Sequence, residues 1–175
     1  KLTERKSELE SLITELKKKT EKYSVKFDVL VKAIVNLNKA WHLEFNFIEA
    51  ELGKINSSQS SLKIDSAFKG NKAAFQKKME DTFRGSSIRK ESFTELAAVY
   101  KDFGEIYTDL AEAAKKARSK AEAFSALFSE NMLTLLPFQI PNKYEVTYNG
   151  KPLNSHSLGQ RASAMMLFLL SQSNN

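Results

Sequence analysis

The feature that most constrains this chain is a heptad-spaced seam of mostly apolar residues near its start. The seam positions are alternately four and three residues apart, with Thr20 and Glu44 as the polar exceptions: Leu9, Ile13, Leu16, Thr20, Tyr23, Phe27, Leu30, Ile34, Leu37, Trp41, Glu44 and Ile48. No proline or glycine precedes Gly53. This pattern predicts one helix over about residues 3–52, roughly 70 Å long at about 1.5 Å per residue, which we interpret as a coiled-coil arm.

The predicted arm broadens toward its end. Aromatic side chains enter the seam from Tyr23 onward, and Phe45 and Phe47 extend the apolar surface beyond two positions per heptad. We therefore expect the arm to run into a globular base near residues 41–52, and Gly53 with the following "NSSQSS" to end the helix. The predicted division is a coiled-coil arm over 1–52 and a helical lobe over 53–175.

A strand and a capped helix are predicted next. In "LKIDSAFKG", the residues Leu62, Ile64, Ser66 and Phe68 alternate onto one face, as in a strand. Asn71 can cap the following helix, which is predicted to end at Gly85. That helix presents three apolar side chains on one face: Ala74, Phe75 and Met79.

A second seam predicts another long helix. Its positions are again three and four residues apart: Phe93, Leu96, Tyr100, Phe103, Tyr107, Leu110, Ala114, Ala117, Ala121, Phe124 and Phe128. The alanines of 113–123 allow close approach of a neighbouring helix, and Pro137 and Pro141 are expected to end the helical region. The fold class predicted from the two seams is mainly α, with a long coiled-coil helix, a helical lobe and a small β element.

The small β element includes a hairpin. Tyr144, Val146 and Tyr148 alternate, and Asn149-Gly150 suits a two-residue turn whose central residues both need positive φ. A hairpin at this position would place Ser157 shortly after its second strand.

Composition excludes several kinds of site. Cysteine is absent from the sequence, so disulfides, zinc–thiolate sites and thiol nucleophiles are excluded. Neither His42 nor His156 has neighbours at metal-ligand spacing, and we predict no metal ligands and no catalytic residues in this chain. The longest apolar run, 165–170, is too short to cross a bilayer, so the expected location is the cytoplasm, with no membrane partner. The net charge of +6 leaves contact with DNA open.

The segment Ser157-Leu158-Gly159-Gln160-Arg161 precedes an apolar helix and has two readings. The spacing of Ser157 and Gln160 is that of a capping box, which accounts for both residues. It does not account for Gly159, since glycine in a helix costs about 1 kcal/mol relative to alanine. A bare glycine beside a serine hydroxyl and Arg161 at a helix N-terminus also suits an anion such as phosphate.

The stretch "HSLGQRASAMMLFLLSQ" resembles the signature motif and following helix of ABC-type ATPases of the SMC, RecF and RecN kind. Residues 142–172, with "YEVTYNGKPL", are particularly similar to SMC-like ATPases of bacterial defence systems of the TrlF type. The resemblance implies the signature-bearing part of an ATPase head, in which Ser157, Leu158, Gly159, Gln160 and Arg161 meet the γ-phosphate of ATP on an opposite head. It also implies Mg and ATP as cofactors, held mainly by other parts of the protein.

The chain departs from the family pattern in places. His156 stands where the family usually has leucine, and no G-x-x-x-x-G-K-[ST] phosphate loop occurs, "FKGNKA" being a superficial echo. No apolar strand ending in Asp-Glu follows the signature helix, so we expect a fragment truncated before that strand and inactive as an ATPase alone. The implied partners are a second head, as in a homodimer, the missing N-terminal ATPase lobe, an effector nuclease or phosphoesterase, and DNA. The implied setting is anti-phage defence or DNA maintenance.

Two other readings remain open. The chain could be a non-enzymatic coiled-coil adaptor, with 157–161 a plain helix cap; Gly159→Ala separates this from the nucleotide site. It could also be a basic DNA-binding helical protein, although no recognition helix or aromatic-basic platform is evident.

Overall fold

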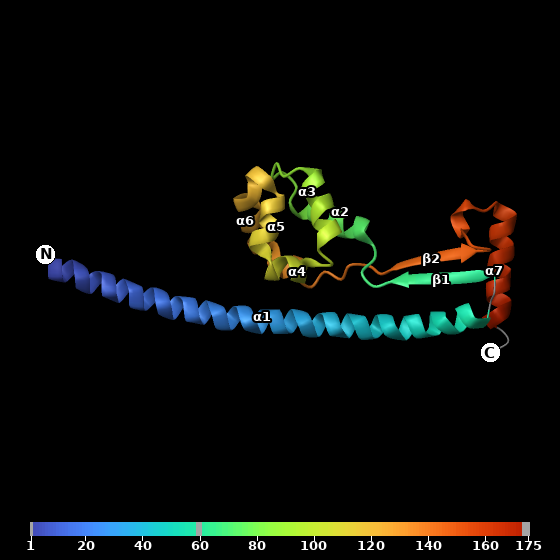
Figure 1. The fold of residues 1–175 in the computed structure, drawn as a ribbon, viewed down its shortest axis with the longest axis horizontal. Coiled ribbons are helices and arrows are strands. Elements are labelled where there is room, and N and C mark those ends of the chain that lie inside the picture. Colours follow the sequence, from blue (N-terminus) through green and yellow to red (C-terminus); the bar gives the residue numbers. More distant parts are fainter. Residues whose placement is uncertain (1, 59–60, 173–175) are drawn as a thin grey trace. The chain divides into compact units, whose positions relative to one another are not determined.

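A computed structural model describes residues 2–58 and 61–172 and is mainly α (Figure 1). It comprises a long N-terminal helix, a lobe of short helices and a three-stranded antiparallel sheet. The predicted mainly α class with a small β element is therefore confirmed. The chain forms two compact units, Lys1–Asn38 and Lys39–Asn175.

The first helix, α1, spans Leu2–Ser58, so it passes through Gly53 and ends within the "NSSQSS" segment that was also predicted to end it. A side chain at Gly53 would meet nothing within 4 Å, so this glycine needs no special conformation or close neighbour. A single exposed glycine costs about 1 kcal/mol, which a helix of this length tolerates. The prediction of an uninterrupted helix over 3–52 is confirmed, and α1 crosses residue 52 without a break.

The first part of the α1 seam is exposed. Within the unit Lys1–Asn38, Leu9, Ile13, Leu16 and Tyr23 expose 50–72% of their surface. An apolar seam with this exposure fits a helix that pairs with another helix. Coiled-coil pairing of the arm stays a prediction.

The sheet joins segments that are distant in sequence (Figure 1). Strand β1 (Leu62–Ala67) pairs antiparallel with β2 (Lys143–Tyr148), from Leu62 opposite Tyr148 to Ala67 opposite Lys143. Strand β3 (Lys151–Pro152) follows a turn in which Asn149 and Gly150 have φ of 49° and 74°. The predicted strand and Asn-Gly hairpin are confirmed.

A group of short helices lies between β1 and β2 in the chain, and from here on the term helical lobe means this group. It consists of α2 (Lys72–Thr82), α3 (Lys90–Val99), α4 (Phe103–Thr108), α5 (Leu110–Lys116), the 3₁₀ turn η1 (Arg118–Lys120) and α6 (Ala121–Leu135). The predicted cap of α2 is confirmed, because Ala74 N donates to Asn71 Oδ1 at 3.0 Å. Phe75 and Met79 of α2 are fully buried, as predicted.

The prediction of one helix along the second seam is wrong. The chain leaves helical geometry at Tyr100, which is extended, and Asp102 starts α4 by accepting a hydrogen bond from Glu105 N at 2.9 Å. Arg118 has a φ of 55°, which ends α5. The three-and-four spacing persists across these breaks because each short helix turns its apolar face into the same core.

Phenylalanine dominates that core. Phe75, Phe103, Phe124 and Phe128 expose at most 1% of their surface. Phe75 and Phe103 meet edge to face with centroids 4.8 Å apart, an arrangement that favours aromatic pairs. The core thus lies within the lobe and binds its five helices together.

After β3 the chain makes a 3₁₀ turn, η2 (Leu153–Ser155), and enters the last helix, α7 (Leu158–Gln172). Ala164 of α7 is fully buried. In the described residues no helix has the length and apolarity needed to span a membrane.

Candidate functional site

The start of α7 carries the complete capping box predicted for Ser157 and Gln160. Ser157 N donates to Gln160 Oε1 at 3.1 Å, and Gln160 N donates to Ser157 Oγ at 3.4 Å. Arg161 N donates to the Ser157 carbonyl at 2.9 Å as the first helical turn. The local sequence therefore fixes both the start of α7 and the position of the serine hydroxyl.

His156 ties the cap to the hairpin. Its Nε2 lies 2.9 Å from the Tyr148 carbonyl, and its Nδ1 lies 3.4 Å from Gln160 Oε1. The imidazole also meets the Tyr148 ring edge-on, with centroids 5.5 Å apart. His156, which departs from the resemblance pattern, thus holds residues 156–160 against the end of β2.

All five predicted site residues lie together on one exposed segment. Ser157, Leu158, Gly159, Gln160 and Arg161 are exposed, and Leu158 exposes 78% of its surface. A Cβ added to Gly159 would meet nothing within 4 Å. Packing in the described chain thus gives no reason for a glycine here, and its backbone is open to an approaching group.

The first turn of α7 has the elements of an anion site. The N–H groups of the first residues of a helix have no partner within the helix, and the positive end of the helix dipole lies there. Backbone amides of this turn can donate to a phosphate oxygen, and the Ser157 hydroxyl could do so only by turning away from Gln160 Oε1, to which it donates at 3.2 Å. Arg161 supplies a positive charge on the same segment.

Arg161 also lines a groove beside the sheet. The groove is open to solvent and has a volume of about 530 Å³. It is lined by Lys143, Tyr144, Glu145, Val146, Thr147, Pro152, Leu153, Asn154 and Arg161. The predicted site residue Arg161 is thereby brought next to β2, which sequence reasoning did not anticipate.

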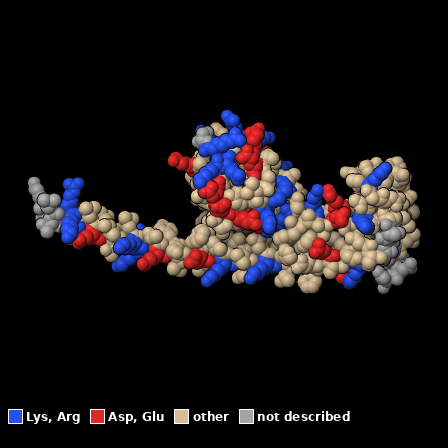
Figure 2. Space-filling model, in the orientation of Figure 1, with Lys and Arg blue, Asp and Glu red and all other residues tan. Residues whose placement is uncertain are grey.

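The apolar surface of α7 is largely uncovered. Met165, Met166, Leu169 and Leu170 expose 55–67% of their surface. Arg161 is the one charged residue of α7, whereas acidic and basic side chains lie close together over the helical lobe (Figure 2). An exposed apolar helix of this kind marks an interaction surface.

A buried ion pair fixes the other end of the sheet. Lys69 Nζ pairs with Asp102 Oδ2, and the two residues expose 4% and 7% of their surface. The ammonium also lies 5.2 Å from the ring centroids of Trp41 and Phe68. Asp102 therefore serves as the cap of α4 and as the counter-ion of Lys69, which joins β1 to the lobe.

The described residues form no metal centre, since no three of their His, Asp or Glu side chains are grouped to hold an ion. The chain matches no protein-family model, and neither a curated protein nor a solved structure shows significant similarity to it.

Sequence reasoning missed three features: the groove at β2, the contacts of His156 and the Lys69–Asp102 pair. Each depends on which segments the fold brings together. The weak signal for the ion pair was that Lys69 follows a strand pattern and Asp102 interrupts a helical one, but nothing local joins the two positions. The signal for the groove was Pro152, which has no backbone N–H and so limits how far β3 can pair with β2.

Proposed function

We propose that residues 157–172 are the signature segment of an SMC-like ABC-type ATPase head, which meets the γ-phosphate of ATP bound by an opposite head. The observation that carries the proposal is Gly159, an exposed glycine in the first turn of α7 with no neighbour within 4 Å of its absent side chain. Ser157 would donate its hydroxyl, and backbone N–H groups of the first turn would donate beside it. Arg161 would add positive charge near the same phosphate.

The remaining chemistry would come from other parts of such an ATPase. A phosphate loop and magnesium ligands hold the nucleotide in these enzymes, and a carboxylate or similar group positions the attacking water. In this proposal the present chain contributes the second wall of the site, and ATP joins the two heads. The exposed apolar face of α7 supports the proposal, because it fits a helix that is covered in a larger head.

The complete capping box favours a second candidate, a coiled-coil adaptor in which residues 157–161 only start α7. The capping contacts of Ser157 and Gln160 are fully explained without a nucleotide. The exposed seam of α1 and the exposed face of α7 would then be protein-binding surfaces.

Gly159→Ala separates the two candidates. Alanine has the better helix propensity and room for its methyl group, so the adaptor reading expects unchanged or slightly higher stability. The nucleotide reading expects impaired ATP-dependent dimerisation, since the methyl group obstructs the approach of the phosphate. Ser157→Arg should block dimerisation by bulk, although its charge suits an anion.

The measurement needs a protein in which this chain is joined to, or combined with, a phosphate-loop lobe. Thermal melting and ATP-dependent dimerisation of wild type and Gly159→Ala are compared by calorimetry and light scattering. A Gly53→Ala variant is the matched control, since its added methyl group also meets open space. Unchanged dimerisation of Gly159→Ala would leave the adaptor reading in place.

A further inference from the structure

The edge of β2 that faces β3 is only partly covered. In the described part of the chain, β3 pairs with β2 at Thr147 and Tyr148 alone. The rest of β2, residues 143–146, has β1 on one side and the groove on the other.

The ladder shows which backbone groups face that open side. Ile64 N donates to Asn56 Oδ1 at 2.8 Å, and Asn56 Nδ2 donates to Ile64 O at 3.0 Å, so the backbone groups of Ile64 point away from β2. Ile64 lies opposite Val146, and in an antiparallel ladder both members of such a pair turn their backbone groups outward. The N–H and C=O of Val146, and those of Tyr144 two residues earlier, therefore point into the groove.

Two other positions on the sheet edges, Ile64 and Tyr148, are already bonded. On the β1 edge, the Asn56 amide satisfies Ile64. On the β2 edge, Tyr148 pairs with Lys151, and its carbonyl also lies 2.9 Å from His156 Nε2. Proteins normally cover or charge such edges because an open edge accepts another strand. Tyr144 and Val146 thus form a short stretch of the β2 edge for which the described residues supply no backbone partner.

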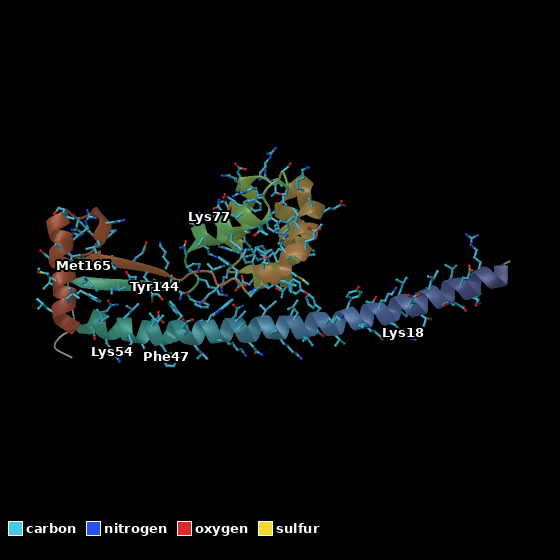
Figure 3. The ribbon with its side chains drawn as sticks, turned by 180° about the vertical axis from the view of Figure 1, so that it is seen from behind. Lys18, Phe47, Lys54, Lys77, Tyr144 and Met165 are labelled. Atoms are coloured by element: carbon cyan, nitrogen blue, oxygen red, sulfur yellow. The ribbon has the colours of Figure 1, made fainter. Side chains whose placement is uncertain are left out.

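We propose that this edge binds an extended peptide segment of a partner protein as an added strand, with an acidic side chain of the peptide held by Arg161. The groove volume of about 530 Å³ is typical of ligand clefts, and strand addition is a common mode of peptide recognition. Tyr144 is labelled on β2 in Figure 3, where Met165 marks the neighbouring helix α7.

The charges that line the groove favour a peptide with an acidic side chain. Lys143 is already paired with Glu145 at 2.7 Å, whereas Arg161 makes no ion pair with any residue that the structure describes. The positive charge left for a ligand in the groove is therefore that of Arg161, whose guanidinium suits a carboxylate. Pro152 and Leu153 add apolar wall on the same side, which fits an apolar residue next to the acidic one.

This inference stands on the edge geometry and does not depend on the nucleotide role of residues 157–161. Its test contains no ATP, so its failure and the failure of the ATPase proposal are distinguishable.

The probe is a fluorescein-labelled peptide with the central sequence Thr-Val-Glu-Val-Thr, and the control peptide has lysine in place of glutamate. Anisotropy measures binding to the full chain, and amide exchange by NMR reports the site. We expect the glutamate peptide to bind at least about tenfold more tightly than the lysine peptide. Exchange should slow at Tyr144 and Val146, and much less at Lys143 and Glu145, whose amides already face β1.

Two charge variants sharpen the test. Arg161→Glu should weaken binding of the glutamate peptide by about tenfold or more and should reverse the preference between the two peptides. Lys77→Glu makes the same charge change at an exposed position of α2, away from the groove (Figure 3), and should leave both affinities unchanged. Val146→Pro removes an N–H that points into the groove and leaves the hydrogen bonds to β1 intact. This variant should not bind the peptide, and it should still unfold cooperatively on heating.

Three results would overturn the proposal. Equal binding of both peptides would remove the role of Arg161, and binding without protection of Tyr144 and Val146 would place the peptide elsewhere. Concentration-dependent self-association that protects these amides without peptide would show that a second copy of the chain occupies the edge.

Discussion

At the residue scale, close packing and charge fix the junction between β1 and α2. Lys69 N donates to Asn142 Oδ1 at 3.0 Å, and Asn71 N donates to the Pro141 carbonyl at 3.1 Å. The two chain segments that enter and leave the helical lobe are thus bonded side by side. Gly70 lies at their point of closest approach.

Gly70→Ala is predicted to destabilise the protein by about 2 kcal/mol or more. Its Cβ would lie 2.7 Å from Lys143 Cβ and 2.8 Å from Ala67 Cβ, which forces two backbone segments apart. Gly53→Ala, in open space within α1, should instead stabilise by up to about 1 kcal/mol. Urea unfolding of both variants checks this, and equal effects would contradict the packing argument.

Tyr100 is predicted to make the free energy of unfolding depend on pH in the alkaline range. Burial, and then its hydrogen bond to Asp109 at 2.8 Å, raise the pKa of Tyr100 to about 12 from an ordinary value near 10. The folded state thus favours the protonated phenol, and this contribution is complete below about pH 10 and lost as the pH rises through about 12. The loss is on the order of 2 to 3 kcal/mol.

The Tyr100→Phe variant isolates this effect from the titration of lysines over the same range. It should be less stable near pH 9 and should lose less stability than wild type between pH 9 and pH 12. Parallel slopes of unfolding free energy against pH in the two proteins would rule out Tyr100 as the source.

At the element scale, α7 has an N-terminus fixed by its own side chains and a body that is mostly uncovered. The cap fixes where the helix begins, and the buried Ala164 shows which side meets the rest of the unit. The long apolar run that follows is therefore mainly surface in this chain. Such a surface has consequences for solubility.

Met166→Lys with Leu169→Lys is predicted to reduce binding of a hydrophobic dye by at least about half, with little change in melting temperature. Both side chains are largely exposed, at 67% and 63%, so charging them removes apolar surface without opening the core. Ala164→Lys is the matched control and should lower the melting temperature, because Ala164 is fully buried. Strong destabilisation by the double variant would mean that this face of α7 is packed.

At the scale of the whole molecule, the helical lobe is an insertion between two paired strands. Ala67 and Lys143 lie opposite each other at the end of the β1–β2 ladder, and residues 68–142 leave and return at that point. The large side chains of the lobe pack on one another within this insertion.

Residues 68–142 are therefore predicted to fold as an isolated peptide with a cooperative thermal transition, at a lower temperature than the whole chain. The Phe core and the Lys69–Asp102 pair remain, whereas the ring contacts of Trp41 and His42 with this segment are lost. Circular dichroism on heating is the measurement. A peptide without cooperative melting would show that the lobe needs the sheet to fold.

The sequence by itself determined the features that depend on near neighbours along the chain. The heptad seam specified α1, Asn71 specified the start of α2, and the Asn149-Gly150 turn and the Ser157–Gln160 cap specified the hairpin and the start of α7. These features need contacts across only a few residues, so local spacing is sufficient to predict them. The signature role of 157–161 stays a prediction.

The tertiary structure decided the features that depend on residues far apart in the sequence. It pairs β1 with β2, buries Lys69 against Asp102, breaks the second seam into short helices around one core, and leaves Tyr144 and Val146 on an open edge beside Arg161. A spacing of three and four is the same for one long helix and for several short ones that share a core. Strand pairing across a 75-residue insertion, 68–142, has no local signal, because the hydrogen bonds that specify it form only when the segments meet.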